Sequence, residues 1–209
     1  MTRKFPIRQK FCIVSAATVL LGLMAAPSAL GREGVAAQHV VSPGAHTATT
    51  KSALVAPAVT CPGQTGLDAP VAAQEEAMRC MTNFARAGSG LPPFSDSALL
   101  DGSAAAKAGD VLECDDFSHF ACGREFTYWI QQGGYFGESC WRAGENLAWG
   151  AGEFGTVRSI FEAWMASPAH RANIVGKYTE MGIALELGDL EGHRGAHVWA
   201  VHFGSHCEV

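Results

Sequence analysis

Three residues in this sequence, His119, Glu145 and His170, combine side-chain types that could do metal chemistry. Two imidazoles and one carboxylate are a donor set of open zinc sites, in which water takes the fourth position. Their separations of 26 and 25 residues match no local metal-binding motif, so only the fold could bring them together. Taken one at a time, each is more often a hydrogen-bonded structural group at the end of an element.

These residues suggest two classes of function. In a metal-assisted hydrolase, His119 and His170 would bind Zn²⁺, and Glu145 would be the catalytic group that orients or deprotonates a water molecule. In a binding module, both histidines would instead hydrogen-bond to Glu145 and stiffen a ligand site without turnover. The sequence has no Gly-x-Ser-x-Gly elbow and no other sign of an activated nucleophile. We therefore favour the binding module over the hydrolase.

A helix between Thr156 and Ser167 is expected to position His170. Large apolar residues recur there with the i, i+3, i+4, i+7, i+8 spacing of a helix with one buried face: Val157, Ile160, Phe161, Trp164 and Met165. Thr156 can cap the helix, and Pro168 disfavours helical backbone at Ser167. His170 is thus expected just past a rigid helix end, and Glu145 just before an apolar Leu-Ala-Trp segment.

The remaining elements indicate an α+β fold. A helix from Asp68–Pro70 to Gly88 is expected, then a second helix capped by Ser95 or Asp96, and a short third helix around Phe126–Ile130 that ends at Gly133-Gly134. The second helix carries the stripe Leu100, Ala104, Ala108, Val111 and Leu112. Residues 181–187 and 198–203 are predicted strands, joined by a loop at 188–196. Helices that do not alternate regularly with strands favour a small antiparallel sheet covered by helices.

Four histidines cluster near the C-terminus, at positions 193, 197, 202 and 206. Alternation along a strand sends His197 and His202 to opposite faces. The pattern therefore argues against a metal site in this cluster.

The first 31 residues have the pattern of a secretory signal peptide. Four cations precede the 16-residue apolar run 11–26, and small residues follow it. An uncleaved anchor is the alternative, although a bilayer span needs roughly 20 residues. Residues 32–66, rich in Ala, Val, Ser, Thr and Pro, are expected to be a disordered or extended spacer, tethered at most by Cys61, and residues 67–209 a single domain. After cleavage we expect no stable membrane span.

Charge and cysteine content fit a secreted protein. Removing residues 1–31 takes away four cations and no anion, so the formal net charge of −5 becomes −9. Such an acidic chain disfavours nucleic acid as a partner. Six cysteines remain, an even number without a Cys-x-x-Cys motif, which indicates three disulfides with fifteen possible pairings.

Several motifs together resemble a CAP (SCP) domain, the domain of cysteine-rich secretory proteins, antigen five and plant pathogenesis-related proteins. The resemblance is strongest to its bacterial secreted branch and covers about residues 72–204. The motifs, in chain order, are Asn83-x-x-Arg86 with Gly90-Leu91-Pro92, then Phe117-Ser118-His119, Gly144-Glu145-Asn146-Leu147-Ala148-Trp149, Trp164-Met165-x-Ser167-Pro168-x-His170-Arg171-x-Asn173-Ile174, and Phe203-Gly204.

The resemblance implies a three-layer α-β-α sandwich with a surface cleft that holds two histidines and acidic residues. By motif, His119, Glu145 and His170 take these places, with Asn146 and Ser167 beside them. Ser167 stands where eukaryotic members have a second acid, and Glu162 is a candidate substitute. A bound Zn²⁺ and an extracellular or cell-wall location are expected, with a small ligand, a lipid or a cell-wall component as the partner. The sterol-binding motif of eukaryotic members is not recognisable.

One disulfide pairing would hold His119 in place. Cys114 and Cys122 bracket the His119 turn and could close a short loop. Cys61–Cys80 and Cys140–Cys207 would then complete the set. The other pairings remain open on the sequence alone.

Overall fold

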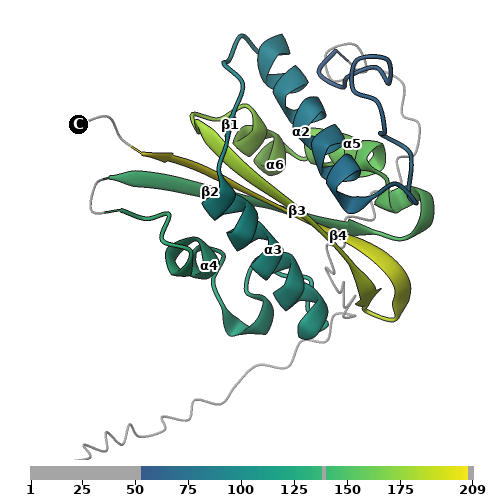
Figure 1. Cartoon of the computed structure of the whole chain (residues 1–209), viewed down its shortest axis with the longest axis vertical. Helices are drawn as coiled ribbons and strands as arrows, with labels where there is room; N and C mark the ends of the chain where they lie inside the picture. The colour runs from purple at the N-terminus through teal and green to yellow at the C-terminus, as the bar shows by residue number, and fades with distance from the viewer. Residues whose placement is uncertain (1–52, 138–139, 207–209) are drawn as a thin grey trace, which may run out of the picture. The chain divides into compact units, whose positions relative to one another are not determined.

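The computed structural model describes residues 53–137 and 140–206. The predicted signal peptide and most of the predicted spacer lie outside these residues. The helices and strands follow one another as α2 (Val71–Gly88), β1 (Ser95–Asp96), α3 (Ala98–Glu113), η1 (Ala121–Gly123), α4 (Thr127–Gln132), β2 (Trp141–Gly150), η2 (Gly152–Gly155), α5 (Val157–Ala166), α6 (Pro168–Ile174), β3 (Glu180–Leu190) and β4 (His193–His206) (Figure 1).

The sheet has the strand order β1-β3-β4-β2, which leaves β2 at one edge. β4 pairs antiparallel with both β3 and β2. β1 contributes only two residues and pairs parallel with β3, so this outermost strand departs from the antiparallel sheet expected from the sequence. β3 and β4 are also longer than predicted, and only Glu191 and Gly192 separate them. Both have positive φ, as a tight two-residue hairpin turn requires.

Helices cover both faces of the sheet, which confirms the α+β fold and the α-β-α sandwich (Figure 1). On one face, α2, α5 and α6 enclose a core that includes Met78, Phe161, Trp164 and Trp199. On the other face, α3 packs over Ala184, Val198 and Ala200. Alternation along each strand divides its side chains between these two cores.

The helix predicted around Trp164 is α5, and its five stripe residues are all buried. Thr156 caps it by accepting a hydrogen bond from the Ser159 backbone N–H, as expected. The structure corrects the position of His170. Pro168 begins a second short helix, α6, so His170 lies inside that helix rather than in a loop after a helix end. Proline fits this first helical position because its missing N–H has no partner there in any case.

Helix α3 lies directly on the sheet because glycine at position 182 leaves room for it. A Cβ built at Gly182 would lie 2.0 Å from the backbone carbon of Leu100. Four residues of the predicted stripe, Leu100, Ala104, Ala108 and Val111, are fully buried, and the fifth, Leu112, is partly buried. The N-cap position is held by Ser97, one residue after Asp96 and two after Ser95, and its side chain makes no capping hydrogen bond.

The packed part of the chain starts earlier than the predicted residue 67. Ala56 and Cys61 are fully buried in the core beside α2. Gln64 is also buried, and its side chain donates to the Ala56 carbonyl and accepts from Arg158 of α5. These contacts hold residues 56–64 against α2 and α5, so this stretch is not an extended spacer.

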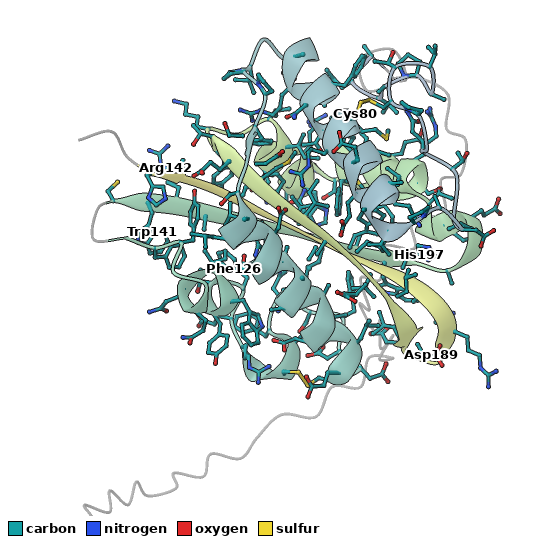
Figure 2. The ribbon with its side chains drawn as sticks, viewed as in Figure 1. Cys80, Phe126, Trp141, Arg142, Asp189 and His197 are labelled. Atoms are coloured by element: carbon teal, nitrogen blue, oxygen red, sulfur yellow. A yellow bond between two sulfur atoms is a disulfide. The ribbon has the colours of Figure 1, made fainter. Side chains whose placement is uncertain are left out.

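Two of the predicted disulfides are present. Cys61 bonds to Cys80 of α2, and Cys114 bonds to Cys122; Cys80 is labelled in Figure 2. Cys140 is also disulfide-bonded. Cys207 lies outside the described residues, so Cys140–Cys207 stays a prediction. It agrees with the register, because the neighbours Trp141 and His206 pair directly.

Among the described residues, no helix combines the length and the apolar character that crossing a bilayer requires.

Candidate functional site

Glu145 is the centre of a group of imidazoles at the edge strand β2. Its Oε1 lies 2.5 Å from Nδ1 of His119, and its Oε2 lies 2.8 Å from Nε2 of His202. Only 1% of the Glu145 side chain is exposed. Both carboxylate oxygens are therefore paired inside the protein, and this pairing offsets the high cost of burying a charge.

The structure corrects one expectation about Glu145. The sequence suggested that His119 and His170 would both hydrogen-bond to it, but the second imidazole on the carboxylate is that of His202. Glu145 pairs with His202 in the β2–β4 register, and both side chains lie on the sheet face that α3 covers. His197 lies on the opposite face, as predicted, where its ring contacts the Leu67 carbonyl.

His119 is the exposed end of this group, with half of its side chain accessible. It follows α3, in the loop that the Cys114–Cys122 disulfide closes. The Nζ of Lys107 donates to its carbonyl oxygen at 2.8 Å. Backbone and ring are thus both held, and the Nε2 atom of His119 is left outside the contact with Glu145.

The charges around Glu145 favour its ionised form. Burial acts to raise its pKa, but hydrogen bonds from His119 and His202, together with the charges of His202 and Lys107, lower the pKa below its ordinary value. Lys107 is itself fully buried, and burial lowers its pKa while Glu145, Asp110 and Asp116 oppose that shift. The site therefore contains a buried cation close to a buried anion.

His170 belongs to the opposite face of the sheet and comes near His119 around the edge strand. Burial lowers the pKa of His170, and the charge of His119 lowers it further, so the two rings are close enough to interact. The carbonyl of His170 accepts from Nδ2 of Asn146 at 3.1 Å. Asn173 donates to both the Glu145 carbonyl and Oδ1 of Asn146. These amides fasten α6 to β2, which gives Asn146 a positioning role.

Two other predicted residues have places in α5 and α6. Ser167 ends α5 and precedes α6, and its carbonyl accepts from the Arg171 backbone N–H. Glu162, the candidate substitute for the missing acid, forms an ion pair with Arg158 at 2.8 Å, one turn away on the same helix.

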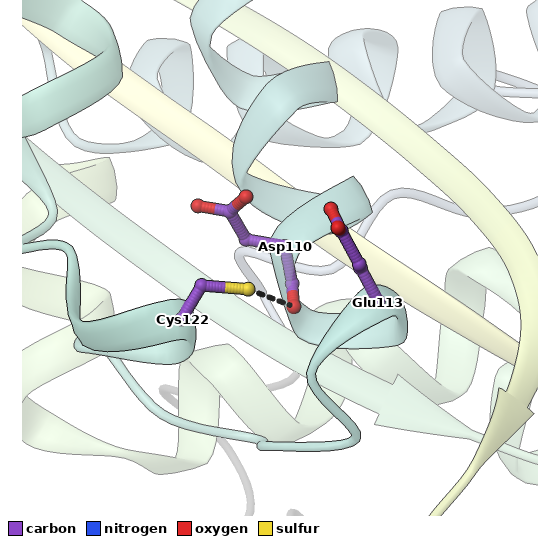
Figure 3. A group of neighbouring side chains, drawn as sticks. All are labelled: Asp110, Glu113 and Cys122. Carbon is purple, nitrogen blue, oxygen red and sulfur yellow. Dashed lines mark hydrogen bonds between the residues drawn. The ribbon is translucent and has the colours of Figure 1, made fainter.

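A three-ligand zinc site is not preformed. Within residues 53–137 and 140–206, the group whose ligand atoms all approach within 4.8 Å of one another is Asp110, Glu113 and Cys122 (Figure 3). The set of His119, Glu145 and His170 is more widely spaced. Any metal at this site would therefore bind to the two histidines, with Glu145 orienting His119 from outside.

The group in Figure 3 is not a metal site in the oxidised protein. Cys122 is bonded to Cys114, so its sulfur is not a thiolate, and its 3.3 Å approach to the Asp110 carbonyl is a contact without a proton to donate. The Asp110 carboxylate already accepts from Arg124 and from Nε1 of Trp129.

The fold includes a cavity of about 330 Å³ between α3 and α4. Its lining includes Leu99, Gly102, Ser103 and Trp129, and none of the predicted site residues.

Sequence reasoning missed Ser103, Lys107 and His202. His202 could have been found by predicting Trp141–Gly150 as a strand, which the sequence analysis did not do. Once β2 is paired with β4, the register places Glu145 opposite His202.

The structure is an α-β-α sandwich that brings histidines and a buried glutamate together at the sheet edge. The profile of the CAP family, described as the cysteine-rich secretory protein family, matches residues 73–203, and the chain belongs to this family. Among individual proteins, it is 32% identical over 147 residues to the uncharacterized protein YkwD of Bacillus subtilis, covering 68% of this chain. The chain spans 55% of the length of YkwD.

Two solved structures share the fold. An extracellular protein containing an SCP domain from Bacillus anthracis matches with a TM-score of 0.52 and 19% identity, over 64% of this chain and 40% of that one. An outer surface protein of Borrelia burgdorferi matches with a TM-score of 0.51 and 18% identity, over 62% of this chain and 90% of that one.

Proposed function

We propose that this chain is a secreted module that binds a ligand at the cell envelope through His119, Glu145 and His170. The observation that carries the proposal is the double pairing of the Glu145 carboxylate at 2.5 and 2.8 Å. A general base needs an oxygen within reach of the water that it deprotonates. Glu145 would have to break a hydrogen bond to provide one, so it is better suited to hold His119 than to do catalysis.

Zn²⁺ is the metal that this group would hold, with His119 and His170 as its ligands. A zinc-binding histidine commonly gives its other ring N–H to a carboxylate, which is the arrangement of His119 with Glu145. The lowered pKa of His170 favours the neutral imidazole that binds metals. The bound metal would supply a Lewis-acidic centre for an oxygen of the ligand.

The surroundings of His119 support a ligand with apolar parts. Phe120, the next residue, is 60% exposed. The net charge of −9 expected after signal cleavage disfavours strongly anionic partners. A lipid or a cell-wall component fits both properties. The extracellular and outer-surface descriptions of the two structural neighbours support the proposed location.

Sedimentation with two kinds of particle tests this proposal. The secreted protein is mixed with purified cell-wall sacculi or with vesicles of neutral phospholipid, with and without Zn²⁺. We expect it to sediment with one of them, and His119→Ala and Phe120→Ala to weaken that binding at least tenfold. Phe154→Ala, at an equally exposed phenylalanine of η2, is the matched control. No sedimentation with either particle would refute envelope binding.

The hydrolase is the outcome that would overturn a pure binding role. Incubation of the zinc-loaded protein with envelope peptides, followed by mass spectrometry, detects turnover. Cleavage that disappears in Glu145→Gln, in a protein that still folds, would show that Glu145 acts as a base despite its two hydrogen bonds.

A further inference from the structure

A line of four hydrogen-bonded side chains runs from α3 along the sheet face that it covers to the exposed ring of His119. Ser103 Oγ lies 2.7 Å from Nδ1 of His202, and Nε2 of His202 lies 2.8 Å from Oε2 of Glu145. Oε1 of Glu145 then meets Nδ1 of His119 at 2.5 Å. Ser103 is on α3, His202 on β4 and Glu145 on β2, so three elements must be assembled to complete the line.

Burial divides this line into an inner and an outer part. His202 is fully buried, Ser103 is 3% exposed, and the Glu145 side chain is 1% exposed. His119 is the member that meets solvent, with half of its side chain accessible. His202 and Glu145 cannot contact a large ligand, so any effect that they have on binding must act through His119.

We propose that Ser103 and His202 form a positioning pair that aims the Glu145 carboxylate at His119. An ionised carboxylate only accepts hydrogen bonds, so both Nε2 of His202 and Nδ1 of His119 carry the proton toward it. Ser103 Oγ donates to the Leu100 carbonyl and lies 2.7 Å from the other nitrogen of His202, and this contact keeps the ring in its orientation. His119 is thereby held as the Nδ1–H tautomer, with Nε2 unprotonated and available to a metal or a ligand proton.

The neighbourhood of Glu145 explains why His202 is needed. Lys107 is a cationic side chain whose charge acts on this carboxylate. Without His202, Oε2 would be left unpaired in the interior, which is unfavourable, and the carboxylate could turn toward Lys107. Because Lys107 also holds the His119 carbonyl, such a turn would disturb both contacts that fix His119.

The inference deepens the proposed site, but its test does not require a ligand. Ring ¹⁵N NMR of the metal-free protein reports the tautomer of each histidine. In the wild type we expect His119 to be the Nδ1–H form. His202→Leu should convert His119 to a mixture dominated by the Nε2–H form that free histidine prefers. His202→Gln, whose amide can still donate to Oε2, should restore the Nδ1–H form.

Matched variants separate positioning from general damage. His197 is also buried on β4, but it lies on the opposite face and near the other end of the sheet from Trp141 (Figure 2). His197→Leu should therefore leave the His119 tautomer unchanged. If His202→Leu does not fold, Ser103→Ala removes one hydroxyl from the same line and should also increase the Nε2–H form of His119.

Zinc titration gives a second readout, which does rest on the proposed function. Loss of an outer hydrogen-bond partner lowers metal affinity by about 10–100-fold, and His202→Leu should fall in this range. If the wild type binds no zinc, the metal proposal fails while the tautomer result still stands. A folded His202→Leu protein in which His119 remains fully Nδ1–H would overturn the positioning role, and so would a wild-type His119 in the free-histidine form.

Discussion

Lys107 holds the His119 loop from inside the protein: its Nζ lies 2.8 Å from the His119 carbonyl oxygen, and no part of the lysine is exposed. A buried cation is unfavourable unless anions compensate for it. Glu145, Asp110 and Asp116 provide that compensation. The contact therefore links the carboxylate of the candidate site to the backbone of its exposed histidine.

Replacing Lys107 by Met should loosen the site. The His119 carbonyl would lose its partner and Glu145 a nearby cation, and we expect a loss of about 1–3 kcal/mol in the free energy of unfolding. Urea denaturation measures this loss. Lys177→Met, at an exposed lysine outside the site, is the control. Equal stability of the wild type and both variants would contradict a structural role for Lys107.

Zinc binding should depend on both His119 and His170. Calorimetric titration at pH 7.5 should show uptake by the wild type, and at least tenfold weaker binding by His119→Ala and by His170→Ala. Exposed His193 provides the control variant His193→Ala. If the wild type and both site variants take up zinc equally, the histidines are not its ligands.

Acid should weaken the same zinc binding. Protons compete for imidazole, whose unperturbed pKa is about 6.5, so affinity should fall below roughly pH 6. Burial, followed by the charge of His119, lowers the pKa of His170. This shift moves the loss of the neutral His170 ligand to lower pH than for a free histidine. Titration at pH 5.5 beside pH 7.5 measures the difference, and unchanged affinity would exclude imidazole ligands.

The Cys114–Cys122 disulfide should stabilise the fold and hold His119. A bridge of this kind typically contributes roughly 2–4 kcal/mol. The double variant Cys114→Ser/Cys122→Ser should lose that stability and bind zinc more weakly. Cys61→Ser/Cys80→Ser removes the other described bridge, which lies away from His119, and should lower stability without a specific effect on zinc. Equal zinc affinity in both double variants would show that the Cys114–Cys122 disulfide has no specific role in zinc binding.

Glu75 should make stability depend on pH. Burial raises its pKa, although its Oε1 accepts from the Leu185 backbone N–H. A raised pKa means that the folded state holds the proton more tightly. This contribution is complete below the unfolded pKa of about 4.3 and is lost as pH rises through the folded pKa. Glu75→Gln keeps the acceptor oxygen and should therefore raise stability at pH 7 by on the order of 0.5 kcal/mol.

At pH 3.5, where Glu75 is mostly protonated, the advantage of Glu75→Gln should largely vanish. The neighbouring Glu76 has a 76% exposed side chain, so Glu76→Gln is a matched control with little effect at either pH. A constant difference between Glu75→Gln and the wild type from pH 3.5 to pH 7 would show that ionisation of Glu75 is not the cause.

Much of the architecture was predictable from local patterns. The i, i+3, i+4 spacing of apolar residues identified α5 and the buried face of α3, and Thr156 marked the start of α5. Strand β2 was missed because Gly144, Glu145 and Asn146 interrupt its apolar residues. Its polar side chains are buried because partners from other elements pair with them, and no local pattern reports such partners.

The sequence by itself determined helices α2, α3, α4 and α5, two of the three long strands and the family, and it proposed His119, Glu145 and His170 as site residues, because periodicity and motif order are properties of neighbouring residues. Only the tertiary structure decided what Glu145 touches. Its contacts with His119 and His202 join residues 26 and 57 positions away, and they depend on the β2–β4 register and on α3 packing against Gly182. A one-residue change in that register would turn His202 to the opposite face, so its role follows from strand pairing rather than from residue type.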